Sequence, residues 1–295
     1  MSADLRPVKR TGPVGRYAPS PTGDLHLGNL RTALRAWEDC RRRGGTFILR
    51  IEDLDPPRTV PGAEARMIED LRWLGLDWDE GPDAGGPAGP YRQSERGAIY
   101  QAALDELTRR GLTYPCVCSR RDLREASAPH GEAGEPVYPG VCRSADPERL
   151  ARHPGGAAVR FRLPDDAVIE FEDAAAGPQR FDLNRLCGDF VIRRRDGLWA
   201  YQLACAIDDA LMGVTHVVRG ADLLTSTPRQ IAVLRALGLP VPSYCHIPLV
   251  ADEAGRRMCK RDGSCSIRAL RAAGRSADEV RRIIMQARLV DVENG

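Results

Sequence analysis

Apolar residues recur at helical spacing along the N-terminal part of the chain. Within residues 64–74 they fall three or four positions apart, which predicts a helix, and Gly75 is expected to end it. The same spacing predicts a helix that opens at His26 and another over residues 95–109. A stretch rich in glycine and proline at residues 81–90 predicts a loop between the helices of residues 64–74 and 95–109.

Short apolar runs alternate with these helices. Residues 15–18, 46–51 and 214–219 are predicted strands. Strands that alternate with helices indicate a parallel sheet with helical crossovers, because parallel neighbours need a long connection. The pattern therefore predicts an α/β fold.

The pattern changes between residue 114 and about residue 189, where prolines, glycines and short β-like runs dominate. We interpret this stretch as an insertion. The expected division is a catalytic domain of residues 14–113 and 189–262, an insertion of residues 114–188, and a short helical segment of residues 263–295.

Local signals continue after the insertion. The α/β pattern resumes at residues 190–194, and a turn at residues 195–197 leads into residues 198–206, as in a β-hairpin. Sequences typical of a capping box begin at Thr227 and at Ser276. We expect two further helices there.

Composition narrows the class of protein. The apolar fraction of 42% is enough for a globular core, and no apolar run approaches the roughly 20 residues that would cross a bilayer. The N-terminal charges are not followed by an apolar core, so we expect no secretory signal and a cytoplasmic protein. A net charge of +2 does not by itself indicate nucleic-acid binding.

Lysine is almost absent from the basic residues. Of the 43 basic residues, only Lys9 and Lys260 are lysines. A compact ammonium differs from a guanidinium in shape and hydration. Lys260 is therefore a candidate for a role that arginine cannot fill; the alternative is that its identity is due to chance.

The segment at residues 16–29, RYAPSPTGDLHLGN, carries the strongest functional signal. A predicted strand ends in a Pro-rich turn, and His26 and Gly28 then open a helix. Glycine lets a ligand approach the backbone, and the free N–H groups at a helix start favour phosphate. With the imidazole of His26 as an added donor, the segment suits a nucleoside triphosphate.

The cysteines suggest a metal site. Nine cysteines are scattered along a chain too long to need disulfides, so we expect thiols or metal ligands. Cys116, Cys118 and Cys142 offer three thiolates, and tetrahedral zinc needs a fourth donor. Three candidates for that donor are Tyr138, His130 and His153.

The segment at residues 16–29 resembles the HIGH signature of class I aminoacyl-tRNA synthetases, in the form used by the glutamyl and glutaminyl branch, with Asn29 in the fourth position. Further matches extend the resemblance over residues 15–262. They are RIEDLD at residues 50–55, YQLA at 201–204, VRGAD at 218–222 and RMCKR at 257–261. The last is similar to the KMSKS loop, with Cys259 in place of the serine.

The resemblance implies a Rossmann-like catalytic domain and assigns roles to residues. His26 and Lys260 would be catalytic. The ATP site would comprise His26, Gly28, Asn29 and Lys260. The glutamate site would comprise Arg16, Tyr17, Ala18, Pro19, Ser20, Glu52, Tyr201 and Arg219. In that site Glu52 would hold the substrate ammonium, and Tyr201 and Arg219 its carboxylates.

By its cysteine pattern and its shortened form, the chain resembles the glutamyl-queuosine tRNA(Asp) synthetases. This implies one structural Zn²⁺ on Cys116, Cys118, Tyr138 and Cys142, no anticodon-binding domain, and ATP used with Mg²⁺. The partners would be glutamate, ATP and tRNA(Asp) bearing queuosine. Arginines at positions 120, 121, 124, 143 and 193–195 are candidate phosphate contacts.

Three other interpretations stay open at this point. The first is a shortened glutamyl-tRNA synthetase that charges the tRNA 3′ end. The second is a nucleotidyltransferase of the His-x-Gly-His type. The third is a zinc-bearing RNA-binding module without catalytic activity, which would need neither Lys260 nor the glutamate-site residues.

Overall fold

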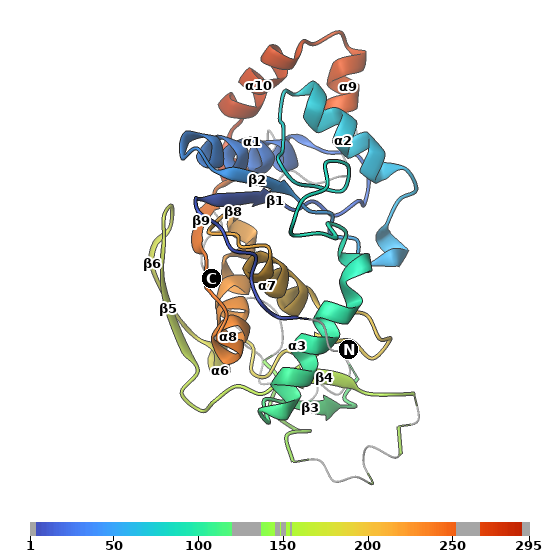
Figure 1. Ribbon diagram of the computed structural model, residues 1–295, viewed down its shortest axis with the longest axis vertical. Helices are drawn as coiled ribbons and strands as arrows, with labels where there is room; N and C mark the ends of the chain where they lie inside the picture. The colour runs from blue at the N-terminus through green and yellow to red at the C-terminus, as the bar shows by residue number, and fades with distance from the viewer. Residues whose placement is uncertain are drawn as a thin grey trace.

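The computed structural model describes residues 4–119, 137–144, 148, 152–153, 155–251 and 266–290 (Figure 1). The elements are β1 Val14–Tyr17, α1 Leu27–Arg42, β2 Thr46–Leu49, η1 Pro56–Arg58, α2 Ala63–Trp73, η2 Gln93–Arg96, α3 Gly97–Arg109, β3 Thr113–Cys116, β4 Ala158–Phe161, β5 Val168–Asp173, β6 Gly177–Asp182, α6 Leu183–Leu186, β7 Val191–Arg193, α7 Tyr201–Leu211, β8 His216–Gly220, η3 Ala221–Ser226, α8 Thr227–Leu237, β9 Ser243–Ile247, β10 Leu249–Val250, α9 Ile267–Ala272, α10 Ala277–Gln286 and β11 Leu289–Val290.

The main sheet has the strand order β2-β1-β8-β9-β5-β6. Strands β2, β1, β8 and β9 are parallel neighbours, which confirms the predicted parallel sheet. Strand β5 joins β9 in parallel through the pair Asp173 and Tyr244, and β6 runs antiparallel to β5 at the edge. The sheet is therefore mixed, and its far edge is a hairpin from the stretch that we expected to be an insertion.

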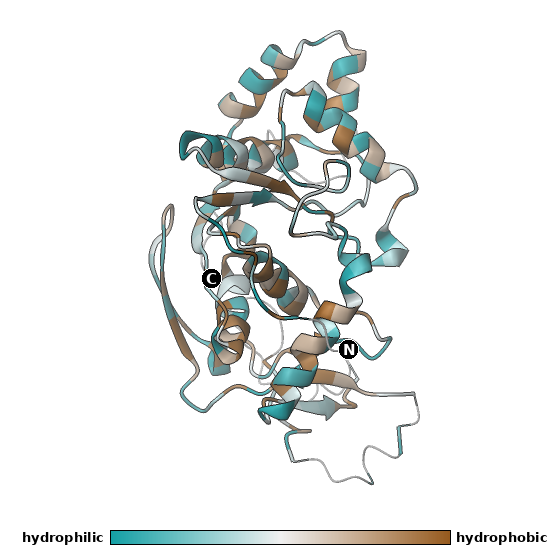
Figure 2. Cartoon of the chain, viewed as in Figure 1, coloured by the Kyte–Doolittle hydropathy of each residue, from teal (hydrophilic) through white to brown (hydrophobic). Residues whose placement is uncertain are grey.

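Helices cover both faces of this sheet, and each face has its own core. In β2, Phe47 and Leu49 pack into the core that includes α1, α2 and α10, whereas Ile48 belongs to the core with α3, α7 and α8. In β8, Val217 and Val218 divide in the same way, because successive strand residues point to opposite faces. Figure 2 shows the central helix α7 as largely hydrophobic and the outer helices α9 and α10 as mixed.

A smaller antiparallel sheet has the order β3-β4-β7. Strand β7 lies beyond the expected end of the insertion, yet it pairs with β4 inside it. The stretch at residues 114–188 thus contributes strands to both sheets. The division into catalytic domain and insertion stays a prediction.

The local predictions fared differently. The turn at residues 195–197 is confirmed, because the Arg194 N–H donates to the Leu198 carbonyl and Arg193 pairs with Trp199 in antiparallel fashion. The hairpin ends sooner than expected, because α7 begins at Tyr201. Nine consecutive residues of α7 are buried, so it lacks the one-sided pattern of a surface helix. The capping box at Thr227 does not form, since its hydroxyl accepts from Arg219 instead. The capping box at Ser276 is confirmed, as is α2 to within one residue of prediction.

Within the described ranges, no helix is both long and apolar enough to pass through a membrane.

Candidate active site

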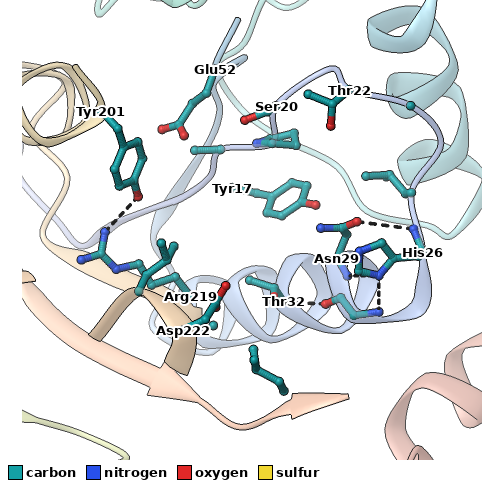
Figure 3. Close-up of a pocket in the computed structure, with 18 of the residues that line it drawn as sticks. Tyr17, Ser20, Thr22, His26, Asn29, Thr32, Glu52, Tyr201, Arg219 and Asp222 are labelled. Carbon is teal, nitrogen blue, oxygen red and sulfur yellow. Dashed lines mark hydrogen bonds between the residues drawn. The ribbon is translucent and has the colours of Figure 1, made fainter. Parts of the chain in front are cut away.

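One cavity of about 420 Å³ opens where β1 and β8 end and α1 begins (Figure 3). The carboxyl ends of parallel strands commonly form such a site. The lining includes every described residue that we predicted for the glutamate and ATP sites: Arg16, Tyr17, Ala18, Pro19, Ser20, His26, Gly28, Asn29, Glu52, Tyr201 and Arg219. Lys260 lies outside the described residues, so its predicted role stays a prediction.

His26 occupies the N-cap of α1. Its Nδ1 accepts from the backbone N–H groups of Gly28 at 3.1 Å and Asn29 at 3.4 Å, and the Asn29 side chain reaches back to the His26 backbone. The N–H groups that we expected to be free for phosphate are therefore used by the imidazole. An Nδ1 that accepts carries no proton, so the Nε2 atom is the remaining donor.

Gly28 is needed for this cap. A Cβ atom at position 28 would lie 2.9 Å from Cε1 of His26, too close for the ring to keep its position. The glycine that we associated with ligand approach thus makes room first for a side chain of the protein. The helix start presents an imidazole N–H rather than a bare row of amides.

Three charged or polar groups gather in another part of the cavity. Figure 3 shows Glu52, Tyr201 and Arg219 around one side and His26 with Asn29 around the other. The Nη1 atom of Arg219 donates to the Tyr201 hydroxyl at 3.3 Å. Burial raises the pKa of Tyr201 well above its usual value and also raises the pKa of Glu52. An incoming ammonium would favour the ionised carboxylate of Glu52.

A buried ionic network stands behind this side of the cavity. Arg50 is fully buried and pairs with Asp209 at 2.7 Å and with Glu52 at 3.0 Å. Arg16 also contacts Asp209, at 3.3 Å. Burial favours a higher pKa for Asp209, but the two arginines outweigh it and hold that pKa below its usual value. Asp209 could not be predicted from the sequence, because its partners Arg16 and Arg50 lie more than 150 positions away.

Arg219 makes two further hydrogen bonds that the sequence did not suggest. Its Nε atom donates to Nε2 of His246, and its Nη2 atom donates to the hydroxyl of Thr227. The other ring nitrogen of His246 lies 2.6 Å from Asp173. These residues come from β9, α8 and the end of β5, so only the folded sheet brings them together.

The predicted metal ligands also lie together. The Sγ atoms of Cys116, Cys118 and Cys142 lie within 4.8 Å of one another. The hydroxyl of Tyr138 lies 3.5 Å from Sγ of Cys116 and accepts from the backbone N–H of Cys142 at 2.8 Å. Of the two alternative ligands, His153 is exposed and His130 lies outside the described residues.

The arginines proposed as phosphate contacts are partly engaged elsewhere. Arg143 pairs with buried Asp189, and Arg193 lies over the ring of Trp199. Arg194 is exposed and pairs with Asp196. Positions 120, 121 and 124 lie outside the described residues. The contacts of Arg143 and Arg193 account for their presence without a nucleic acid.

The fold and the site define an α/β catalytic domain with a charged pocket beside a helix N-terminus. A family model described as tRNA synthetases class I (E and Q), catalytic domain, matches residues 14–288. The chain belongs to this family. The family assignment argues against both the nucleotidyltransferase and the RNA-binding module without catalytic activity.

Individual relatives refine the comparison. The glutamyl-Q tRNA(Asp) synthetase of Symbiobacterium thermophilum is 57% identical over 271 residues, covering 90% of this chain and 83% of the relative. That of Nitratidesulfovibrio vulgaris is 51% identical, covering 88% of this chain and 81% of the relative. Glutamate–tRNA ligase 2 of Nitrosococcus oceani is 50% identical over 90% of this chain, but the match spans only 57% of that ligase.

A solved structure shares the fold. The glutamate tRNA ligase of Elizabethkingia meningosepticum, crystallised with its amino acid, aligns with a TM-score of 0.75 at 35% identity. The alignment covers 86% of this chain and 53% of that one. The chain thus corresponds to about half of a glutamate–tRNA ligase.

Proposed function

We propose that this protein activates glutamate with ATP and transfers the glutamyl group to queuosine in tRNA(Asp). The observation that carries the proposal is that Glu52, Tyr201 and Arg219 line the same cavity as the His26 cap and lie across from it. The relatives that match this chain over four fifths of their own length, at 57% and 51% identity, bear the name of that activity.

In the first step a carboxylate oxygen of glutamate attacks the α-phosphate of ATP. A P–O bond forms to give glutamyl-adenylate, and the bond to the leaving pyrophosphate breaks. The carboxylate is already ionised at neutral pH, so the step requires no general base. The protein contributes position and charge. In the second step an acceptor hydroxyl attacks the activated carbonyl, AMP leaves, and the hydroxyl loses its proton.

Each group in the cavity has a matching role. The carboxylate of Glu52 binds the substrate ammonium, and Arg219 with Tyr201 binds a substrate carboxylate. The Nε2–H of His26 donates to the triphosphate at the start of α1. Lys260 neutralises the departing pyrophosphate, and Mg²⁺ accompanies ATP.

We propose that the cysteine cluster holds one structural zinc ion. Three thiolates and one phenolic oxygen would complete the four ligands that zinc prefers, and the separations of these atoms suit a shared ion. The hydrogen bond from the Cys142 backbone orients the Tyr138 oxygen. The ion would stabilise the chain around these four ligands, within the stretch at residues 114–188 that we propose to be an insertion.

The second candidate function is transfer of glutamate to the 3′ end of a glutamate tRNA. The 50% identity with the ligase of Nitrosococcus oceani favours it. The pocket serves both candidates equally, because glutamate is activated in the same way. Only the acceptor separates them.

Two measurements test the proposal. Glutamate-dependent exchange of pyrophosphate into ATP is expected without added RNA, and its absence would contradict the activation step. Radiolabelled glutamate is then offered to tRNA(Asp) with queuosine, to tRNA(Asp) with guanosine at that position, and to tRNA(Glu). Label on the first alone supports queuosine as acceptor, whereas label on tRNA(Glu) supports the second candidate.

Removal of a zinc ligand is expected to unfold the metal-bearing part. Cys142→Ser should reduce bound zinc from about one equivalent to well below half and lower the melting temperature, because a structural ion adds its binding energy to folding. Metal analysis and thermal melting measure both. Cys187→Ser, at a buried thiol outside the cluster, is the control for zinc content. Equal zinc in both variants would contradict the assignment.

A further inference from the structure

Arg219 is held along one edge of its guanidinium. The Nε atom donates to Nε2 of His246 at 3.0 Å, and the Nη2 atom donates to Oγ1 of Thr227 at 2.7 Å. The Thr227 hydroxyl lies 3.0 Å from Nε2 of His246 and donates to it when that nitrogen is unprotonated, so the two groups form one linked surface for the Nε–Nη2 edge. The opposite edge, between Nη1 and Nη2, includes the Nη1 atom that donates to the Tyr201 hydroxyl, and both residues line the cavity. That edge has the shape for a two-pronged pair with a carboxylate.

The tautomer of His246 decides whether the Nε–H of Arg219 has an acceptor. Arg219 can only donate, so the Nε2 atom of His246 must carry a lone pair. The proton then belongs on Nδ1, which lies 2.6 Å from a carboxylate oxygen of Asp173. The carboxylate of Asp173 enforces this arrangement, because an ionised acid only accepts hydrogen bonds.

Asp173 is itself fixed in place. Its other oxygen accepts from the backbone N–H groups of His246, Ala175 and Ala176, at 3.1, 3.0 and 2.9 Å. Asp173 is 1% exposed and His246 is 2% exposed, so water does not compete for these bonds. The β5–β6 hairpin thereby places the ionised carboxylate of Asp173 behind His246.

We propose that Asp173 and His246 are positioning residues that orient Arg219 and so determine the affinity for the substrate carboxylate. This inference rests on the proposed function, in which Arg219 binds glutamate. Neither residue lines the cavity, and both act through the guanidinium. The pair gives the edge hairpin a part in amino-acid recognition, in addition to closing the sheet.

The sharpest test is Asp173→Asn. The asparagine oxygen is expected to keep the three backbone donors, so its NH₂ group faces Nδ1 and drives the histidine proton to Nε2. An Asp-to-Asn change behind a histidine elsewhere is known to trap the wrong tautomer. Nε2–H would then oppose the Nε–H of Arg219. We expect the KM for glutamate in pyrophosphate exchange to rise about 10- to 100-fold, as for a buried donor that loses its partner.

The readouts separate positioning from a merely structural role. The kcat and the KM for ATP should change little. The double variant Asp173→Asn with His246→Phe should have a KM for glutamate no higher than that of the more impaired single variant, because the two residues act as a unit. Glu80→Gln is the matched control, since Glu80 is also buried and hydrogen-bonded to an arginine and a tyrosine but does not line the cavity. It should lower thermal stability without a selective change in glutamate KM.

A folded Asp173→Asn protein with an unchanged KM for glutamate overturns the inference, as does an equal rise in the KM for ATP. If that variant fails to fold, Thr227→Val tests the same held edge through its other acceptor, and an unchanged glutamate KM there also overturns it. Failure of the proposed function looks different, because the unmodified protein would then show no glutamate-dependent exchange.

Discussion

Arg219→Lys is expected to lower kcat/KM for glutamate in pyrophosphate exchange by about 30- to 3,000-fold, the range for loss of one partner from a buried charge pair. An ammonium keeps the positive charge but has no planar fork. It cannot satisfy His246 and Thr227 on one side and a carboxylate on the other. The loss should appear mainly as a higher KM for glutamate, with the KM for ATP unchanged.

The control is Arg193→Lys, which alters an arginine outside the cavity that contacts Gln101 and Trp199. It should leave exchange kinetics unchanged. Thermal melting of both variants checks that the comparison is between folded proteins. A glutamate KM in Arg219→Lys equal to that of the unmodified protein would remove Arg219 from the amino-acid site.

Much of the cavity could be predicted because its residues lie in contiguous motifs. The segment at residues 16–29 contains a strand end, a turn and a helix start, so its groups share one place in any fold that keeps those elements. Glu52 follows the neighbouring strand, and parallel neighbours end at the same edge of the sheet. Local pattern therefore constrains this part of the site strongly.

The supporting groups could not be predicted, because their meaning depends on distant contacts. Asp173 and His246 are 73 positions apart and meet through strand pairing at the sheet edge. The role of His26 as a cap depends on a rotamer, which spacing does not reveal. In α7 the uniform burial removed the helical periodicity, and the turn before it favoured a hairpin.

Arg50→Met is expected to reduce the free energy of unfolding by about 3–5 kcal/mol at neutral pH, the usual cost of removing one partner from a buried ion pair. Methionine fills a similar volume, so the loss is mainly electrostatic. Arg50 is the counter-charge of Glu52 and shares Asp209 with Arg16, at a site where all of these side chains are at least nine-tenths buried. Without Arg50, Glu52 keeps its burial and loses its nearest cation.

The pH dependence of that loss has a definite sign. In the unmodified protein the pKa of Asp209 is held below its usual value, so its stabilising contribution is complete above the unfolded-state pKa and is lost as the pH falls. Without Arg50 the pKa values of Glu52 and Asp209 in the folded state should both rise. A carboxyl with a raised folded pKa lowers stability once the pH exceeds its unfolded pKa of about 4. The difference between the two proteins should therefore grow from acid to neutral pH.

Urea unfolding near pH 5 and near pH 7 measures this difference. Arg72→Met is the control, because Arg72 pairs with Asp83 through a side chain that is 61% exposed. It should cost no more than about 1 kcal/mol at either pH, as exposed pairs do. A loss in Arg50→Met that matched this control, or that shrank as the pH rose, would show that Glu52 and Asp209 do not depend on Arg50. In that case packing, and not the charge of Arg50, would stabilise this wall of the cavity.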